Sequence, residues 1–171
     1  LTFTCASAQK IPEKLLKNAE SGDGAAMNEI GEIYWHGKIV KADEQKAFEW
    51  FEKSAEKGNS DGQSNVASFY YYGIGRDKNI YLALSYFKTA ALSGNKSAQY
   101  HLGALYARTD IPIDDFGQRL FPNGLPDYIA SCAWLNILGD HDYIKPCEAR
   151  LTPKQISEMQ TEIETIKRSM H

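Results

Sequence analysis

Residues 30–58 read IGEIYWHGKIVKADEQKAFEWFEKSAEKG, and this stretch decides the fold. Residues 66–94 read VASFYYYGIGRDKNIYLALSYFKTAALSG and repeat its small, aromatic and glycine positions after a shift of 36, so that Phe51 aligns with Phe87. No gap is needed, and a third copy begins on schedule near Leu102. A period between about 20 and 50 residues is typical of repeat proteins, in which each unit buries its apolar face against the next one.

The first half of each copy has the pattern of an amphipathic helix. In the first copy, Ile30, Ile33 and Tyr34 recur at the spacing of one helical face. Gly31 forms helices poorly, so its presence on that face indicates close contact with a neighbouring helix. Gly37 is placed to end the helix.

The second half of each copy predicts a second helix. Asp43 is a good N-cap, and Ala47, Trp50 and Phe51 follow on one face that we expect to be buried. Gly58 ends this helix. Two antiparallel helices per 36 residues cannot cover both of their apolar faces alone, so stacking of the pairs is expected.

The third copy is interrupted, because Trp134 follows Trp50 by 84 residues where two periods would give 72. The extra residues fall within a Pro- and Gly-containing segment that cannot form one helix. Near the C-terminus, Thr152, Pro153 and Gln155 predict a capping box that opens a final helix. We therefore expect residues 1–8 to be the remnant of a secretion signal and residues 9–171 to be a single domain, made of a cap helix 10–22, repeats 23–58 and 59–94, an interrupted repeat 95–142 with an insertion 107–127, and a C-terminal cap 143–171.

The pattern Leu/Ile-Gly-x-x-Tyr-x-x-Gly, then Asp, then Lys-Ala-x-x-Trp-Phe-x-Lys-x-Ala-x-x-Gly resembles the Sel-1-like repeat, and residues 30–58 supply it almost completely. Residues 133–136 and 151–156 resemble the closing half-repeat and tail of bacterial members. The resemblance implies an all-α, right-handed α-solenoid superhelix of antiparallel helix pairs, related to tetratricopeptide repeats, with a C-terminal capping helix. It also implies a non-enzymatic adaptor role in protein–protein interaction.

The resemblance further implies that the first helix of each pair lines the concave surface. Residues off the repeat-defining face would then form adjacent rows and bind a protein or peptide. The other reading is an ordinary solvated helix face. The binding residues that we predict on this surface are Glu29, Glu32, His36, Asn65, Ser68, Tyr72, His101 and Arg108.

The N-terminal residues predict export from a bacterial cytoplasm to the periplasm or the medium. Ala6-Ser7-Ala8 has the small-x-small form of a signal-peptidase site and follows an apolar stretch. Cleavage there removes Cys5 and leaves Cys132 and Cys147, an even pair in an oxidising compartment. The pair is either a disulfide or two buried thiols.

Composition and motifs argue against several other functions. The net charge is −3 with scattered Lys and Arg, and no run of 18 apolar residues occurs, so we expect neither nucleic-acid binding nor stable membrane insertion. No cofactor, metal site or catalytic residue is expected. The alternative is a cell-wall-related hydrolase or a β-lactamase-like enzyme, because residues 54–57 fit Ser-x-x-Lys. Against it, Ser54 occupies a repeat position where the next copy has Ala90.

Overall fold

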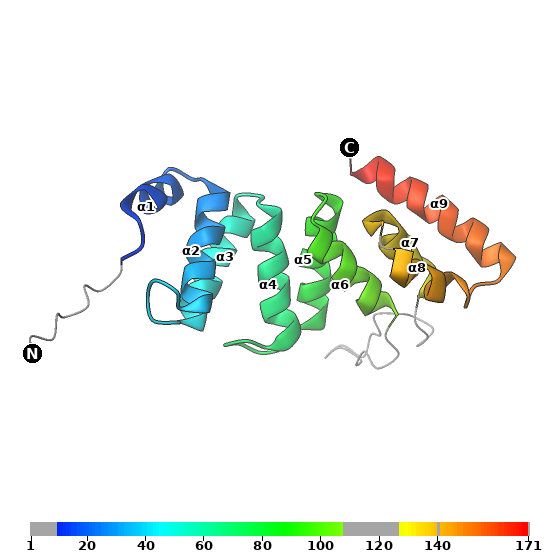
Figure 1. The fold of residues 1–171 in the computed structure, drawn as a ribbon, viewed down its shortest axis with the longest axis horizontal. Helices are drawn as coiled ribbons and strands as arrows, with labels where there is room; N and C mark the ends of the chain where they lie inside the picture. Colours follow the sequence, from blue (N-terminus) through cyan, green and yellow to red (C-terminus); the bar gives the residue numbers. More distant parts are fainter. Residues whose placement is uncertain (1–9, 108–126, 140, 171) are drawn as a thin grey trace, which may run out of the picture. The chain divides into compact units, whose positions relative to one another are not determined.

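The computed structural model describes residues 10–107, 127–139 and 141–170, and this part of the chain is entirely helical apart from turns and loops (Figure 1). The all-α prediction is therefore confirmed. Arg108, most of the insertion 107–127 and the proposed cleavage site at residues 6–8 lie outside the described residues. The helices are α1 (Glu13–Glu20), α2 (Gly24–His36), α3 (Glu44–Glu56), α4 (Ser60–Tyr72), α5 (Ile80–Leu92), α6 (Lys96–Tyr106), α7 (Tyr128–Leu138), α8 (His141–Glu148) and α9 (Pro153–Ser169).

Side-chain N-caps recur at the same repeat positions. Asp43 accepts a hydrogen bond from the backbone N–H of Lys46 at the start of α3, and the equivalent caps of α5 and α7 are Asn79 and Asp127. Such caps satisfy backbone donors that the first helical turn leaves without a partner. At the other end of α2, Gly37 adopts a left-handed conformation with φ of 64°. The predicted capping box of the last helix is also present, formed by Thr152 and Gln155.

The chain forms two compact units, Leu1–Lys78 and Asn79–His171. In the first unit, α2 and α3 are antiparallel, because Ser54 near the end of α3 bonds to Gly24 at the start of α2. Helices α3 and α4 are also antiparallel, since Phe48 in the first half of α3 contacts Tyr70 near the end of α4. Helices α2 and α4 consequently run in the same direction and lie side by side (Figure 1).

The close approach predicted at Gly31 is present in the first unit. A Cβ atom added there would lie 2.6 Å from the Phe51 ring and 3.2 Å from the Ala47 carbonyl oxygen, so only glycine fits without rearrangement. The expected burial of Trp50 is only partly correct. Phe48 is 1% exposed and contacts Phe69, whereas Trp50 lies at the edge of the core with the Lys53 ammonium 4.4 Å from its ring centroid.

Ser54 fills a narrow space where three helices meet. Its side chain is fully buried, and its hydroxyl donates a 2.7 Å hydrogen bond to the Gly24 carbonyl oxygen of α2. A Cβ added to Gly62 of α4 would collide with Ser54. The residue therefore packs α2, α3 and α4 together.

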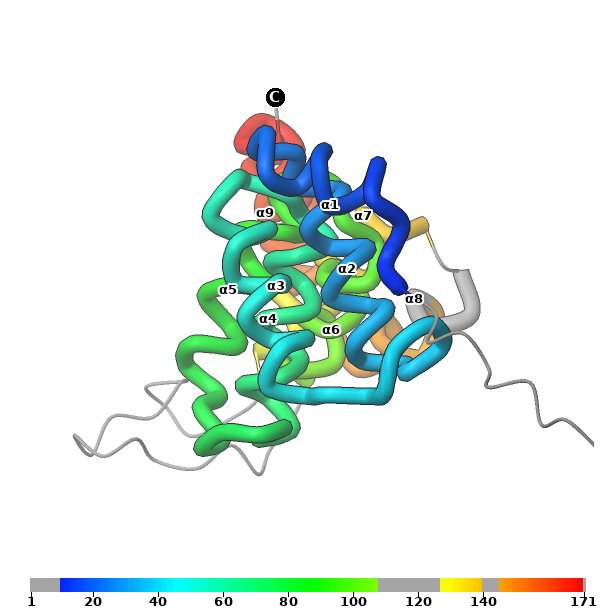
Figure 2. Tube along the Cα trace, turned by 90° about the vertical axis from the view of Figure 1, so that its left-hand side faces the viewer, coloured from blue at the N-terminus to red at the C-terminus, as the bar shows by residue number. Residues whose placement is uncertain are grey.

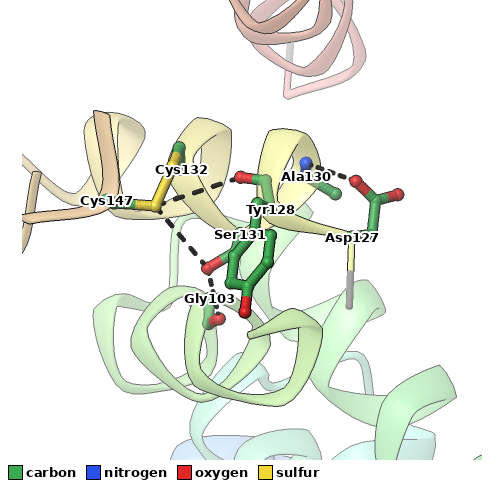
Figure 3. The surroundings of a disulfide bond; sticks show 7 residues. All are labelled: Gly103, Asp127, Tyr128, Ala130, Ser131, Cys132 and Cys147. Carbon is green, nitrogen blue, oxygen red and sulfur yellow. Dashed lines mark hydrogen bonds between the residues drawn. A yellow bond between two sulfur atoms is a disulfide. The ribbon is translucent and has the colours of Figure 1, made fainter. Parts of the chain in front are cut away.

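The second unit repeats the close helix pairing in α6 and α7. A Cβ added to Gly103 would lie 2.7 Å from Leu135 Cγ, and Gly103 and Leu135 are the repeat equivalents of Gly31 and Phe51. Ser131 of α7 donates a 2.8 Å hydrogen bond to the Gly103 carbonyl oxygen (Figure 3). The pairing thus continues past the insertion in the third copy.

A disulfide between Cys132 and Cys147 joins α7 to α8 (Figure 3). The two Cα atoms are 5.7 Å apart, inside the usual range for a disulfide, and both residues are buried. The Cys147 sulfur also lies 4.0 Å from the hydroxyl oxygen of Ser131, the residue that bonds to α6. Helix α9 packs on α7 and buries Met159, Ile163 and Ile166.

Candidate functional site

The predicted rows on α2 and α4 come together in the first unit, and we call this surface the α2–α4 face. Glu29, Glu32 and His36 of α2 are exposed, and Tyr72 at the end of α4 is 60% exposed. Asn65 and Ser68 of α4 are half-buried. The face thus runs along two parallel neighbouring helices and is accessible at both of them.

A chain of amide hydrogen bonds crosses this face. Asn65 Nδ2 of α4 donates a 2.9 Å bond to Asn28 Oδ1 of α2, and Asn28 Nδ2 donates a 3.0 Å bond to Glu32 Oε1. Asn28 is only 7% exposed, so its amide fixes the side chains of Asn65 and Glu32 from beneath. Buried polar groups of this kind are costly to leave without a partner, which makes the arrangement rigid.

Sequence reasoning missed Asn28, although its pattern held a signal. An Asn inside an otherwise apolar helix face is unusual, because Asn competes for backbone hydrogen bonds and is disfavoured in helix interiors. Such a residue needs hydrogen-bond partners when it is buried. Glu32 and Asn65 are those partners.

The C-terminal end of the α2–α4 face is aromatic. The Trp35 ring of α2 lies 4.9 Å from the Phe69 ring of α4, centroid to centroid, and ties the two helix ends together. Tyr71 and Tyr72 form an edge-to-face pair at 4.8 Å. Tyr72 therefore presents a large ring to solvent on a well-packed support, as is common for anchors of recognition sites.

Helices α2 and α4 carry acidic residues but no Lys or Arg. The acidic residues are Glu29, Glu32 and Asp61. By contrast, α3 mixes both signs, with Lys46 and Lys53 among its acids. The α2–α4 face is thus acidic and aromatic.

His101, the remaining predicted residue that the structure describes, belongs to α6 in the second unit. Its ring stacks on the buried ring of Phe87, with centroids 4.7 Å apart and planes 23° apart. Burial lowers the pKa of His101 below the ordinary value of 6.5. The neutral imidazole is therefore the form that this packing favours.

Residues 54–57 lack the surroundings of a hydrolase site. The Ser54 hydroxyl is enclosed and donates its hydrogen bond to a backbone carbonyl, while Lys57 is exposed. Among the described residues, no group of three or more His, Cys, Asp and Glu side chains is placed to hold a metal ion. No helix in the described ranges is both long enough and apolar enough to cross a membrane.

Comparison with known proteins identifies the repeat. The pattern of the Sel1 repeat matches residues 24–59 and 60–95. The chain is similar to a Sel1 repeat protein from Oxalobacter formigenes, at 26% identity and a TM-score of 0.58, over 86% of this chain and 96% of that one. It shares its fold, at 22% identity and a TM-score of 0.51, with a protective antigen of uropathogenic Escherichia coli strains that displays an SLR fold, over 91% of this chain and 48% of that one. No curated protein sequence matches the chain.

Proposed function

Because residues 24–95 belong to the Sel1 repeat family, we propose that the chain is a non-enzymatic interaction module of the bacterial cell envelope that binds a protein or peptide on its α2–α4 face. Sel1 repeats generally mediate protein–protein interactions. The partner segment is cationic, and it lies along α2 and α4.

The observation that carries this proposal is the combination of shape, charge and rigidity on the α2–α4 face. Glu29 and Glu32 offer carboxylates at successive turns of α2, and neither α2 nor α4 contains a Lys or Arg. Tyr72 adds an exposed ring that suits a Lys or Arg side chain through a cation–π contact. The hydrogen bonds of Asn28 hold the polar groups in place, which lowers the entropy cost of binding.

Placement in the periplasm or the medium is supported by the cysteines. A buried disulfide such as Cys132–Cys147 persists in oxidising compartments and is rare in a mesophilic cytoplasm. Protein expressed with its complete native leader should then be recovered outside the cytoplasm with Gln9 as its first residue. A cytoplasmic form that keeps residues 1–8 would contradict the export proposal.

Charge reversal tests the binding proposal. The double variant Glu29→Lys with Glu32→Lys should weaken retention of the envelope partner by the immobilised chain, because like charges repel the cationic segment. The matched control is Glu44→Lys with Glu49→Lys on α3. Glu49 accepts a hydrogen bond from Gln45 four residues earlier, as Glu32 does from Asn28, so each double variant loses one such bond, an exposed one on α3 and a half-buried one on α2.

The expected result is loss of the partner from the α2 variant and retention by the α3 variant. Retention by the unmodified chain should also fall as salt rises above about 0.15 M, where charges more than about 8 Å apart are already screened. Equal retention by both variants, or retention that salt does not alter, would reject the α2–α4 face as the binding surface.

A further inference from the structure

A hollow in the first unit is lined by residues before and within α1, by Tyr34 of α2 and by the α2–α3 loop. Figure 2 shows the backbone before α1 beside α2. The hollow consists of two adjoining cavities of about 490 Å³ and 370 Å³ that share Tyr34 and Val40. We call the two cavities together the N-terminal groove. Its residues are Lys10, Ile11, Glu13, Leu16, Tyr34, Val40, Lys41, Ala42, Asp43 and Lys46.

The larger cavity is open to solvent and mostly apolar, and the two charged residues in its lining, Lys10 and Glu13, have opposite signs. Ile11, Leu16, Tyr34 and Val40 are half-buried, and all four pack against the core cluster that contains Ile30. Each of these side chains keeps part of its surface exposed to the cavity while its other side is held by the core. A volume of about 490 Å³ accommodates a Leu or Phe side chain together with adjacent backbone.

The smaller cavity is polar, and its net charge is positive. Its charged residues are two lysines, Lys41 and Lys46, and one carboxylate, Asp43. That carboxylate is already engaged, since it accepts the N-cap hydrogen bond from the Lys46 N–H and lies 3.5 Å from the Lys46 ammonium. Lys41 is exposed on the loop, and it is the cation that a bound carboxylate would meet.

From these two adjoining halves we propose that the N-terminal groove binds an extended peptide segment in which an apolar side chain is followed by an acidic one. The apolar side chain enters the cavity between Leu16 and Val40, and the carboxylate contacts Lys41. The chain's own residues 1–9, LTFTCASAQ, contain no acidic residue and so match only the apolar half. This site uses different residues from the α2–α4 face and prefers the opposite charge, so it goes beyond the function proposed above.

The test is an NMR titration of the ¹⁵N-labelled full chain with the peptide acetyl-Ser-Leu-Glu-Ser-amide. Binding is monitored through the chemical shifts of the backbone amides of Val40, Lys41 and Ala42. Two matched peptides replace Leu by Ser or Glu by Lys. We expect saturable shifts with the first peptide and weaker binding of the Glu-to-Lys peptide, by up to about fivefold, the upper end of the range for one exposed ion pair. The Leu-to-Ser peptide should also bind more weakly.

Variants of the protein assign the two halves of the groove. Lys41→Glu should reverse the preference between the Glu and Lys peptides. Val40→Ser should weaken the binding of every peptide that contains Leu. Lys57→Glu is the control, because Lys57 is exposed at the opposite end of α3. It should leave the preference unchanged.

Four results would overturn the proposal. Equal binding of the three peptides would show that the groove does not recognise an apolar and an acidic side chain. A preference that Lys41→Glu does not alter would show that Lys41 does not contact the carboxylate. Binding that appears only after deletion of residues 1–9 assigns the groove to the chain's own N-terminal segment. Concentration-dependent shifts of the same amides without peptide assign it to a second copy of the chain.

Discussion

Phe48 and Trp50 stand two positions apart on α3, and their surroundings predict different costs of truncation. Phe48 is 1% exposed and touches Phe69 and Tyr70, so Phe48→Ala should lower the free energy of unfolding by about 3–5 kcal/mol. Trp50 is half-buried, and Trp50→Ala should cost less. Chemical denaturation of the two variants checks this order.

Lys57→Ala provides the reference for that series, because Lys57 is exposed and its loss should change stability by no more than about 0.5 kcal/mol. If Lys57→Ala cost more than Phe48→Ala, the assignment of the buried face of α3 would be wrong. A larger loss for Trp50→Ala than for Phe48→Ala would show that the edge of the core matters more than its centre.

His101 predicts a pH dependence of stability. Its pKa in the folded chain is lowered by burial, so the folded state binds fewer protons than the unfolded state near the unfolded pKa of about 6.5. The contribution is therefore complete above that pKa and is lost as the pH falls towards the folded pKa. Urea unfolding at pH 7.5 and 5.5 should show this loss, and His101→Gln should reduce the difference. An unchanged difference would mean that other groups cause it.

At the scale of helices, the close contacts at Gly31 and Gly103 predict that a methyl group added at either position lowers the stability of the fold. Alanine favours a helix by about 1 kcal/mol over glycine, but overpacking costs about 1–3 kcal/mol. The added Cβ would lie 2.6 Å from the Phe51 ring in one variant and 2.7 Å from Leu135 Cγ in the other. Gly31→Ala and Gly103→Ala should both lower the denaturation midpoint.

Glu29→Ala is the matched control for these glycine variants, since it changes an exposed position of the same helix α2 and should be nearly neutral. A higher midpoint for either glycine variant would show that the facing side chain moves aside easily. The two helix pairs would then not be equivalent contacts.

The periodicity predicted the helix pairs well because their boundaries are set locally. Gly37, Asp43 and Thr152 act through backbone conformation or through bonds within three residues, and each was recognisable from its neighbours. The short helix α8 begins at His141, two residues before the predicted C-terminal cap, and contains Pro146. No repeat partner exists for this helix, so the 36-residue pattern carried no information about it.

The candidate site was predictable only in part. Helical spacing placed Glu32 and Asn65 on one face, but the bond that joins them through Asn28 depends on the register between α2 and α4. Arg76 shows the same limit. It reads as a loop cation, yet its guanidinium lies on the face of the Phe48 ring and donates a 3.2 Å hydrogen bond to the Tyr70 hydroxyl. The N-terminal groove likewise combines residues from the segment before α1, from α1, α2 and α3, and from the α2–α3 loop.

At the scale of the whole molecule, the disulfide lies in only one of the two compact units. Cys132 and Cys147 are 15 residues apart, and both belong to unit Asn79–His171. In repeat proteins stability is roughly a sum of local terms and contacts between neighbours, so a local crosslink acts mainly on the helices near it. Reduction should therefore affect α7 and α8 more than α2 and α3.

A crosslink that closes a loop of about 15 residues adds about 3 kcal/mol, which corresponds to roughly a hundredfold change in an opening equilibrium. After reduction, or in the Cys132→Ala, Cys147→Ala double variant, amide hydrogen exchange in α7 and α8 should accelerate by up to that factor while exchange in α2 and α3 stays unchanged. Cys5→Ala is the control and should alter neither region.

Thiol counting on denatured, unreduced protein should find one free thiol in the full chain and none in a chain that begins at Gln9. Two free thiols in the shorter chain would show that Cys132 and Cys147 are buried but unbonded, and equal acceleration in α2 would show that the crosslink stabilises both units together.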